Sequence, residues 1–175
     1  MEPIRTLVVS YSRSGNTRRL ARAIAKALGA DHEEIQDRAD RAGITGYLRC
    51  ALEAFFEAST EIGPPRHDPA DYDLVVVGTP VWATSVSSPV RTFLWLERQR
   101  LPAVGFFATL GGVGSEHAFG QMRGLAGKAP TSTLAIRENE LARGVPAERV
   151  ARFAEKLRAG AARRGGRRGK LRAVS

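Results

Sequence analysis

Near its amino end the chain reads Ile4-Arg5-Thr6-Leu7-Val8-Val9-Ser10-Tyr11-Ser12-Arg13-Ser14-Gly15-Asn16-Thr17, and this stretch decides the fold. The nearly continuous apolar run over Ile4–Ser10 predicts a strand that is buried on both faces. Small polar residues follow, and Asn16–Leu28 has the apolar spacing of an amphipathic helix that stops at Gly29. This order places hydroxyl groups and backbone N–H groups at a helix N-terminus, where the helix dipole favours an anion. We therefore expect the loop to bind the phosphate of a small cofactor.

The same alternation of strands and helices continues along the chain. Further strands are predicted at Glu33–Gln36, Leu74–Gly78, Val104–Thr109 and Ser132–Arg137. Further helices are predicted at Ile44–Ser59, at Pro89–Arg98 after a Ser88 cap, at Ser115–Leu125, and at Pro146–Ala159. Five strands, each followed by a helix, indicate an α/β fold with a parallel sheet covered on both faces.

Three loops rich in Gly, Ser and Thr fall at the carboxyl ends of the predicted strands. They span Ser10–Thr17, Thr79–Ser88 and Thr109–Ser115. Ligands of such sheets bind at this edge, near the point where the strand order reverses. The shared composition of the loops therefore predicts one composite site.

The size of the chain, 175 residues, and its composition suit a protein with one globular domain. No apolar run is long enough for a membrane span, and no basic-then-apolar leader is present, so a cytoplasmic location is expected. Cys50 is interpreted as a small filler of a packed helix face. No His, Cys or carboxylate spacing predicts a metal site.

The net charge of +9 is unevenly distributed. Residues 158–175 carry seven basic side chains and no acidic one, which leaves residues 1–157 nearly balanced. We expect residues 1–157 to form the folded domain and residues 158–175 to be a mobile Arg/Gly-rich tail. The tail could attract an acidic partner or serve only as a solvated extension.

The first two loops and the helix after them resemble the flavodoxin family. The resemblance rests on Tyr11 to Thr17, on Val75-Val76-Val77-Gly78-Thr79-Pro80-Val81-Trp82-Ala83, and on Pro89 to Leu94. The third loop, Thr109 to Gly114, is similar to the corresponding family loop. The resemblance covers most of residues 4–157. It implies a flavodoxin-like three-layer fold with strand order 2-1-3-4-5 that holds FMN without a covalent bond.

The resemblance implies a phosphate site in the first loop. Its members are Ser12, Arg13, Ser14, Gly15, Asn16 and Thr17. Hydroxyls of Ser12, Ser14 and Thr17 can donate to a phosphate, and Gly15 lets the backbone approach it closely. Arg13 departs from a family pattern that often relies on backbone dipoles. Its guanidinium either reaches the phosphate or points to solvent.

The second and third loops are implied to hold the flavin ring. Their members are Pro80, Val81, Trp82 and Ala83, and Thr109, Leu110, Gly111 and Gly112. The indole of Trp82 either covers one ring face or packs between loop and helix. Many family members cover the other face with a tyrosine from the third loop, where this chain has glycines and Val113. We expect that face to be open, or covered by Tyr47, Phe56 or a partner subunit in a homodimer.

Three functions remain open at this point. The first is an electron carrier that serves a redox partner protein. The second is a reductase that takes hydride from NAD(P)H and passes electrons to a quinone or another small acceptor, with His117 as a candidate proton donor. The third is a cofactor-free binding module whose basic tail holds nucleic acid or an acidic partner.

Overall fold

The computed structural model describes residues 4–38 and 59–172. Within these residues, five parallel strands form a sheet in the order β2-β1-β3-β5-β6. Their bounds are β1 Thr6–Ser10, β2 Asp31–Glu34, β3 Leu74–Trp82, β5 Ala103–Leu110 and β6 Thr133–Arg137. Counted along the chain as main strands, this order is 2-1-3-4-5, so the predicted flavodoxin-like topology is confirmed.

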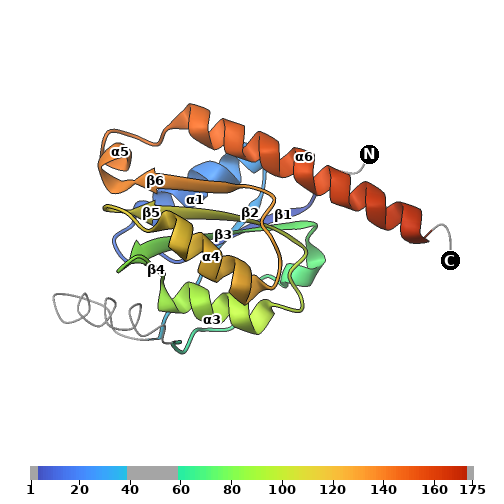
Figure 1. The fold of residues 1–175 in the computed structure, drawn as a ribbon, viewed down its shortest axis with the longest axis horizontal. Coiled ribbons are helices and arrows are strands. Elements are labelled where there is room, and N and C mark those ends of the chain that lie inside the picture. The colour runs from blue at the N-terminus through green and yellow to red at the C-terminus, as the bar shows by residue number, and fades with distance from the viewer. Residues whose placement is uncertain (1–3, 39–58, 173–175) are drawn as a thin grey trace.

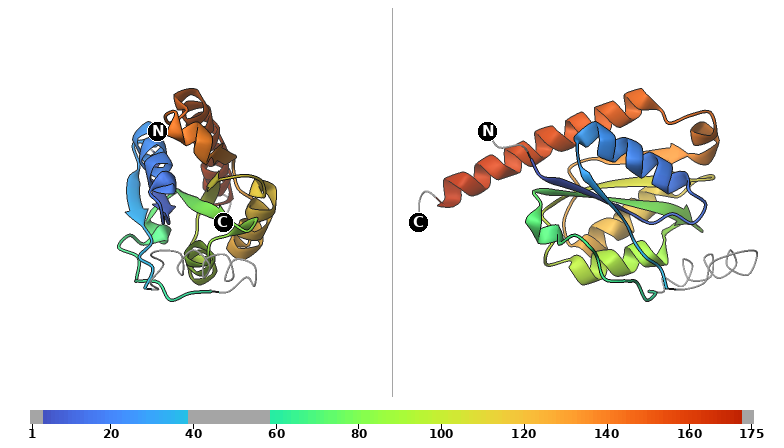
Figure 2. Two further views of the ribbon diagram at one scale, coloured as in Figure 1. Left: turned by 90° about the vertical axis from the view of Figure 1, so that its left-hand side faces the viewer. Right: turned by 180° about the vertical axis from the view of Figure 1, so that it is seen from behind.

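Alternating side chains of β1 divide the core into two layers. Val8 packs in one cluster with side chains of α1 (Asn16–Leu28) and α6 (Ala147–Arg172). Leu7 and Val9 face the other side and pack with α3 (Ser88–Glu97) and α4 (Ser115–Ala126). The sheet therefore lies between two helical layers, as Figures 1 and 2 show. Both faces of the three central strands, β1, β3 and β5, are buried, which explains their continuous apolar sequences. The edge strands β2 and β6 are only partly buried.

The predicted element bounds are close to the observed ones, with small corrections at the caps. The α1 bounds agree, α3 differs from prediction by one residue at each end, and α4 differs by one residue at its carboxyl end. The N-cap of α3 is Ser87 rather than Ser88, and α4 is capped by Gly114. The predicted helix over residues 44–59, including Cys50, Tyr47 and Phe56, falls outside the described residues except at its end.

The expectation of a loop over Thr79–Ser88 is corrected by a hairpin. Strand β3 continues to Trp82 and pairs antiparallel with β4 (Ser85–Val86), with Val81 opposite Val86 and Trp82 opposite Ser85. The hairpin was not predicted because its turn residues, Ala83 and Thr84, are not the usual residues of a tight hairpin. Two short elements were not predicted: the 3-10 helix η1 (Pro69–Asp71) and helix α5 (Glu138–Ala142).

The last helix is longer than predicted. Helix α6 continues past Ala159 to Arg172, into the segment expected to be a separate tail, and extends beyond the sheet in Figures 1 and 2. Ala161 is still packed in the core cluster, and alanine and arginine are strong helix formers. The mobility of the basic segment stays a prediction. No helix of the described residues has the length and apolarity to cross a membrane.

Candidate functional site

The three predicted loops meet at one cavity of about 310 Å³ at the carboxyl edge of the sheet. Because β1, β3 and β5 are neighbours and parallel, the segments that follow them emerge side by side. The cavity is lined by Arg13 and Ser14, by Pro80, Val81, Trp82, Ala83 and Thr84, by Leu110, Gly111, Gly112 and Val113, and by Glu138. Nine of these residues were predicted from the sequence to belong to the site.

The first loop ends in a helix N-terminus that suits an anion. Gly15 caps α1 with φ 95°, a left-handed backbone conformation that glycine adopts readily. No side chain caps this helix and no acidic residue lies in its first turn. The first backbone N–H groups of a helix have no acceptor within the helix, so those of Asn16, Thr17 and Arg18 are available to a ligand.

Two of the predicted hydroxyl groups already have partners in the protein. The hydroxyl of Ser12 accepts a hydrogen bond from the backbone N–H of Gly15 at 3.1 Å, and it can still donate its own proton. The buried hydroxyls of Thr17 and Thr109 form a hydrogen bond of 2.7 Å with each other. This bond joins the start of α1 to the end of β5, so Thr17 and Thr109 connect two of the loops. Neither residue lines the cavity.

Trp82 is held in the cavity wall by a second aromatic ring. The rings of Tyr11 and Trp82 lie edge to face, with their centroids 5.7 Å apart and their planes at 90°. Tyr11 is buried and follows β1, whereas Trp82 ends β3 and is partly exposed. The contact fixes the indole between the first and second loops and leaves part of it open to the cavity.

The β3–β4 turn has an unfavourable backbone. Ala83 and Thr84 adopt φ values of 45° and 66°, in the left-handed region that β-branched residues avoid. Gly114, at φ 106°, packs against this turn so closely that a Cβ on it would lie 2.6 Å from Cα of Thr84. The surrounding structure therefore overcomes local backbone preference at this cavity wall, which is common at binding sites.

Gln121 of α4 connects the hairpin to the helical layer. Its Oε1 accepts a hydrogen bond from the backbone N–H of Val86 at 3.0 Å. Its Nε2 lies 3.4 Å from the hydroxyl of Ser85 and 3.1 Å from Nε2 of His117. A buried bond between the hydroxyls of Thr79 and Ser87 closes the base of the hairpin. The hairpin wall is thus held from two sides.

The structure adds three residues that the sequence analysis did not assign to the cavity. Thr84 and Val113 extend the second and third loops, and Glu138 begins α5 directly after β6. The position of Glu138 at the carboxyl end of a strand is the signal that could have identified it. His117 is exposed and does not line the cavity. His67 also lies away from the cavity, with its Nδ1 2.8 Å from Oε2 of Glu33 on β2.

The fold is a doubly wound α/β sheet, and its cavity lies at the switch point, where ligands of such sheets bind. Residues 5–142 match the flavodoxin family, and the chain belongs to that family. No match to a curated protein sequence was found.

Three solved structures have a similar fold. A flavoprotein from Lactobacillus acidophilus in complex with FMN has 23% identity and a TM-score of 0.66, over 80% of this chain and 97% of that one. Two-electron reduced flavodoxin from Megasphaera elsdenii has 18% identity and a TM-score of 0.55, over 90% and 98%. An oxidoreductase from Corynebacterium diphtheriae has 19% identity and a TM-score of 0.55, over 93% and 99%. At sequence identities this low, the structural similarity establishes the fold alone.

Proposed function

We propose that this protein binds FMN without a covalent bond in the 310 Å³ cavity and acts in electron transfer. The observation that carries the proposal is the convergence of three distant segments beside an uncapped helix N-terminus. The cavity volume is at the small end of the range for cofactor pockets, which suits a ligand that stays partly exposed. Membership of the flavodoxin family and the FMN-bound Lactobacillus relative support it.

The amino end of α1 would hold the phosphate. Its backbone N–H groups and dipole favour a dianion, and no acidic side chain in the first turn opposes one. Arg13 and Ser14 line the cavity and add a guanidinium and a hydroxyl donor. Ser12 does not line it, but its hydroxyl lies in the same loop and can still donate a proton. Thr17 would act indirectly, because its hydroxyl is bonded to Thr109.

The hairpin and the third loop would hold the ring. Trp82 offers a flat surface whose position is fixed by Tyr11, so little rotamer freedom is lost when a ring stacks on it. Backbone groups of Val81 and Ala83 could bond to ring heteroatoms, and Gly111 and Gly112 leave room for the ring to enter. Bound FMN would supply the redox chemistry, while the protein orients it and controls its access to water and partners.

A reductase is the second candidate, and the third loop favours it. Gly111, Gly112 and Val113 contribute no aromatic side chain to the described cavity, and Val113 is 74% exposed. A small donor or acceptor could therefore approach the ring on that side. Anaerobic stopped-flow mixing with NADPH tests this function: rapid bleaching of the flavin band supports a reductase, and an unchanged band supports a carrier that serves a redox partner protein.

Comparing FMN with riboflavin tests the proposed cofactor. The two ligands share the ring, but only FMN has the phosphate. Titrations of the full chain, followed by flavin fluorescence, should show FMN binding at least about tenfold more tightly, since charge-assisted hydrogen bonds each contribute roughly 1.5–3 kcal/mol. Equal affinities would contradict a phosphate site at α1. Absence of binding by both ligands would favour the cofactor-free binding module.

A further inference from the structure

A second hollow lies along α6, near the amino end of β6 and therefore far along the strand from the cofactor cavity. Its volume is about 910 Å³, and it lies between α6 and the segment that leads into β6. A smaller hollow of about 120 Å³ continues it and shares Arg152 and Lys156. We call the combined feature the α6 groove; its two walls are residues 130–134 and the α6 residues from Arg149 to Arg163.

The groove exists because α6 packs closely against residues 130–131. At Gly160, a Cβ would lie only 1.9 Å from Cγ2 of Thr131, so the helix can approach at this level only with glycine. Beside this contact, Ser132 and Thr133 add short hydroxyl side chains to the wall opposite the helix. Such hydroxyls are common donors to phosphate oxygens.

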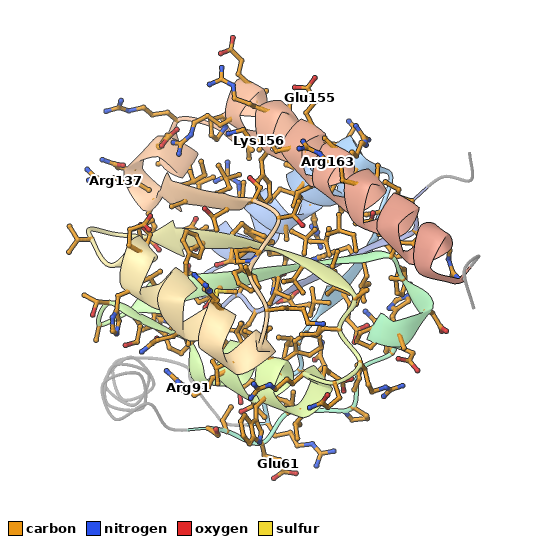
Figure 3. All side chains as sticks on the ribbon, turned by 45° about the vertical axis from the view of Figure 1, so that its right-hand side comes forward. Glu61, Arg91, Arg137, Glu155, Lys156 and Arg163 are labelled. Carbon is orange, nitrogen blue, oxygen red and sulfur yellow. The ribbon has the colours of Figure 1, made fainter. Side chains whose placement is uncertain are left out.

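Basic side chains occupy one side of the helix wall. At 3.6 residues per turn, Arg149, Arg152, Lys156 and Arg163 fall within a sector of about 60° over about 21 Å of helix. Figure 3 labels Lys156 and Arg163 along α6, with the acidic groove residue Glu155. Arg152 and Lys156 are exposed, and no ion pair to either is found among the described side chains of residues 4–38 and 59–163. Arg149 is held at the groove end by Glu140, at 2.8 Å from both carboxylate oxygens.

The charge of the whole molecule is concentrated on this helix. Residues 147–172 contain ten basic and two acidic side chains, which account for eight of the nine net positive charges. The attraction that this produces for a polyanion is strong at low salt and screened at high salt.

We propose that the α6 groove binds the sugar-phosphate backbone of a nucleic-acid duplex without reading its base sequence. An extended row of cations with short hydroxyls opposite matches backbone contacts, which fix position but carry no sequence information. Phe153 lines the groove but is 3% exposed, so it offers no ring for base stacking.

Two other polyanions fit the groove less well. An anionic membrane surface would require a free apolar face, yet Val150, Phe153 and Leu157 of α6 are packed in the core. An acidic protein would normally bind through buried aromatic or apolar anchors as well as charge. The groove-lining residues offer charges, hydroxyls and small side chains instead.

Fluorescence anisotropy with a labelled mixed-sequence DNA duplex of about 20 base pairs tests the proposal. The full chain should bind at about 50 mM salt and lose affinity steeply towards about 200 mM. The double variant R152Q/K156Q should bind at least about tenfold more weakly, and its slope of log K against log salt should fall by about 1.8, or 0.9 for each lost phosphate contact.

The variant K26Q/R123Q is the matched control, because it removes two exposed charges from α1 and α4. Its affinity should stay close to that of the unchanged protein. Equal weakening in both variants, or no binding at about 50 mM salt, would overturn the proposal. Displacement of the duplex by polyglutamate as effectively as by unlabelled duplex would overturn it in favour of an acidic protein. Retention of FMN by the R152Q/K156Q variant is a separate readout, since this inference does not rest on the cofactor.

Discussion

At the scale of single residues, the cavity wall is built against local backbone preference. Ala83 and Thr84 have left-handed φ angles at the hairpin turn, a conformation that asparagine and glycine adopt more readily. Such strain costs roughly 1–3 kcal/mol for each residue and persists only where its surroundings impose it. Here Gly114 packs on the turn from the third loop, so two loops fix each other.

Replacing Thr84 with glycine should stabilise the protein. The T84G variant removes the β-branched side chain from φ 66°. We expect a gain of about 1 kcal/mol in the free energy of unfolding, because relief of strain outweighs the added freedom of the unfolded chain. Thermal unfolding should show a rise of about 2–4 °C for a chain of this size. Loss of stability in T84G would show that the side chain contributes contacts worth more than the strain.

His32 should make stability fall in mild acid. Burial lowers its pKa from the ordinary 6.5 more than the carboxylate of Glu34 raises it. Nearby cations lower it further: Arg22, Arg18 and Arg66. The unfolded chain therefore takes up a proton near pH 6.5 that the folded protein resists. As pH falls below this value, the unfolded state gains stability relative to the folded state.

Urea unfolding on either side of pH 6.5 measures this effect. The unchanged protein should lose more stability on acidification than the H32Q variant, which has no imidazole at this position. H117Q is a suitable control, because it removes an exposed histidine and should retain the pH dependence. If H32Q lost as much stability as the unchanged protein, the dependence would come from other groups.

At the scale of elements, the site depends on how α4 holds the hairpin. The side-chain amide of Gln121 accepts from the backbone of β4 and lies within reach of Ser85. Val86 is completely buried, so its backbone N–H has no access to water if this acceptor is lost. Helix α4 therefore positions Trp82 of β3 indirectly, through its contacts with β4.

The Q121L variant should weaken both the fold and the site. An unsatisfied buried N–H costs about 1–3 kcal/mol in stability, and a looser hairpin should reduce FMN affinity about fivefold, or by 1 kcal/mol. Urea unfolding and FMN titration measure the two effects. Q99L, which alters an exposed glutamine beyond α3, should change neither quantity. An unchanged FMN affinity in Q121L would mean that the hairpin is positioned by its other contacts.

At the scale of the whole molecule, the regular alternation of strands and helices could be predicted from the sequence. Features that depend on contacts between distant residues could not. The parallel order followed from apolar runs that alternate with helical spacing, and the cavity followed from three loops of similar composition. The hydrogen bond between Thr17 and Thr109 joins residues 92 positions apart, and no local pattern indicates it.

The remaining differences have equally physical causes. The hairpin has none of the usual turn residues. Its shape is imposed by packing against Gly114, which is distant in the sequence. Glu138 lies outside any glycine-rich loop, so its position directly after a strand was the only sequence signal that it reaches the cavity. The glycines after Ala159 suggested an irregular tail, whereas α6 continues through them and creates the second groove.

The two sites are centred at opposite ends of the strands, and they approach each other at Arg149, which also lines a hollow with Leu110, Gly112 and Val113 of the cavity. The cofactor cavity lies at the carboxyl ends of the strands, whereas residues 130–134 of the α6 groove lead into the amino end of β6. Arg13 and Glu138 give the cavity one charge of each sign, while the positive charge gathers on α6. Ligand binding at one site can therefore be altered by substitution without changing residues that line the other.

Calorimetric titration of FMN into three proteins tests the cofactor site most directly: the unchanged chain, W82A and W95A. These are the two tryptophans of the chain, one in the cavity wall and the other 61% exposed on α3. We expect one FMN bound for each unchanged chain, an affinity at least about tenfold lower in W82A from lost stacking and burial, and no change in W95A. No heat from the unchanged chain, or equal affinity in W82A, would contradict the account.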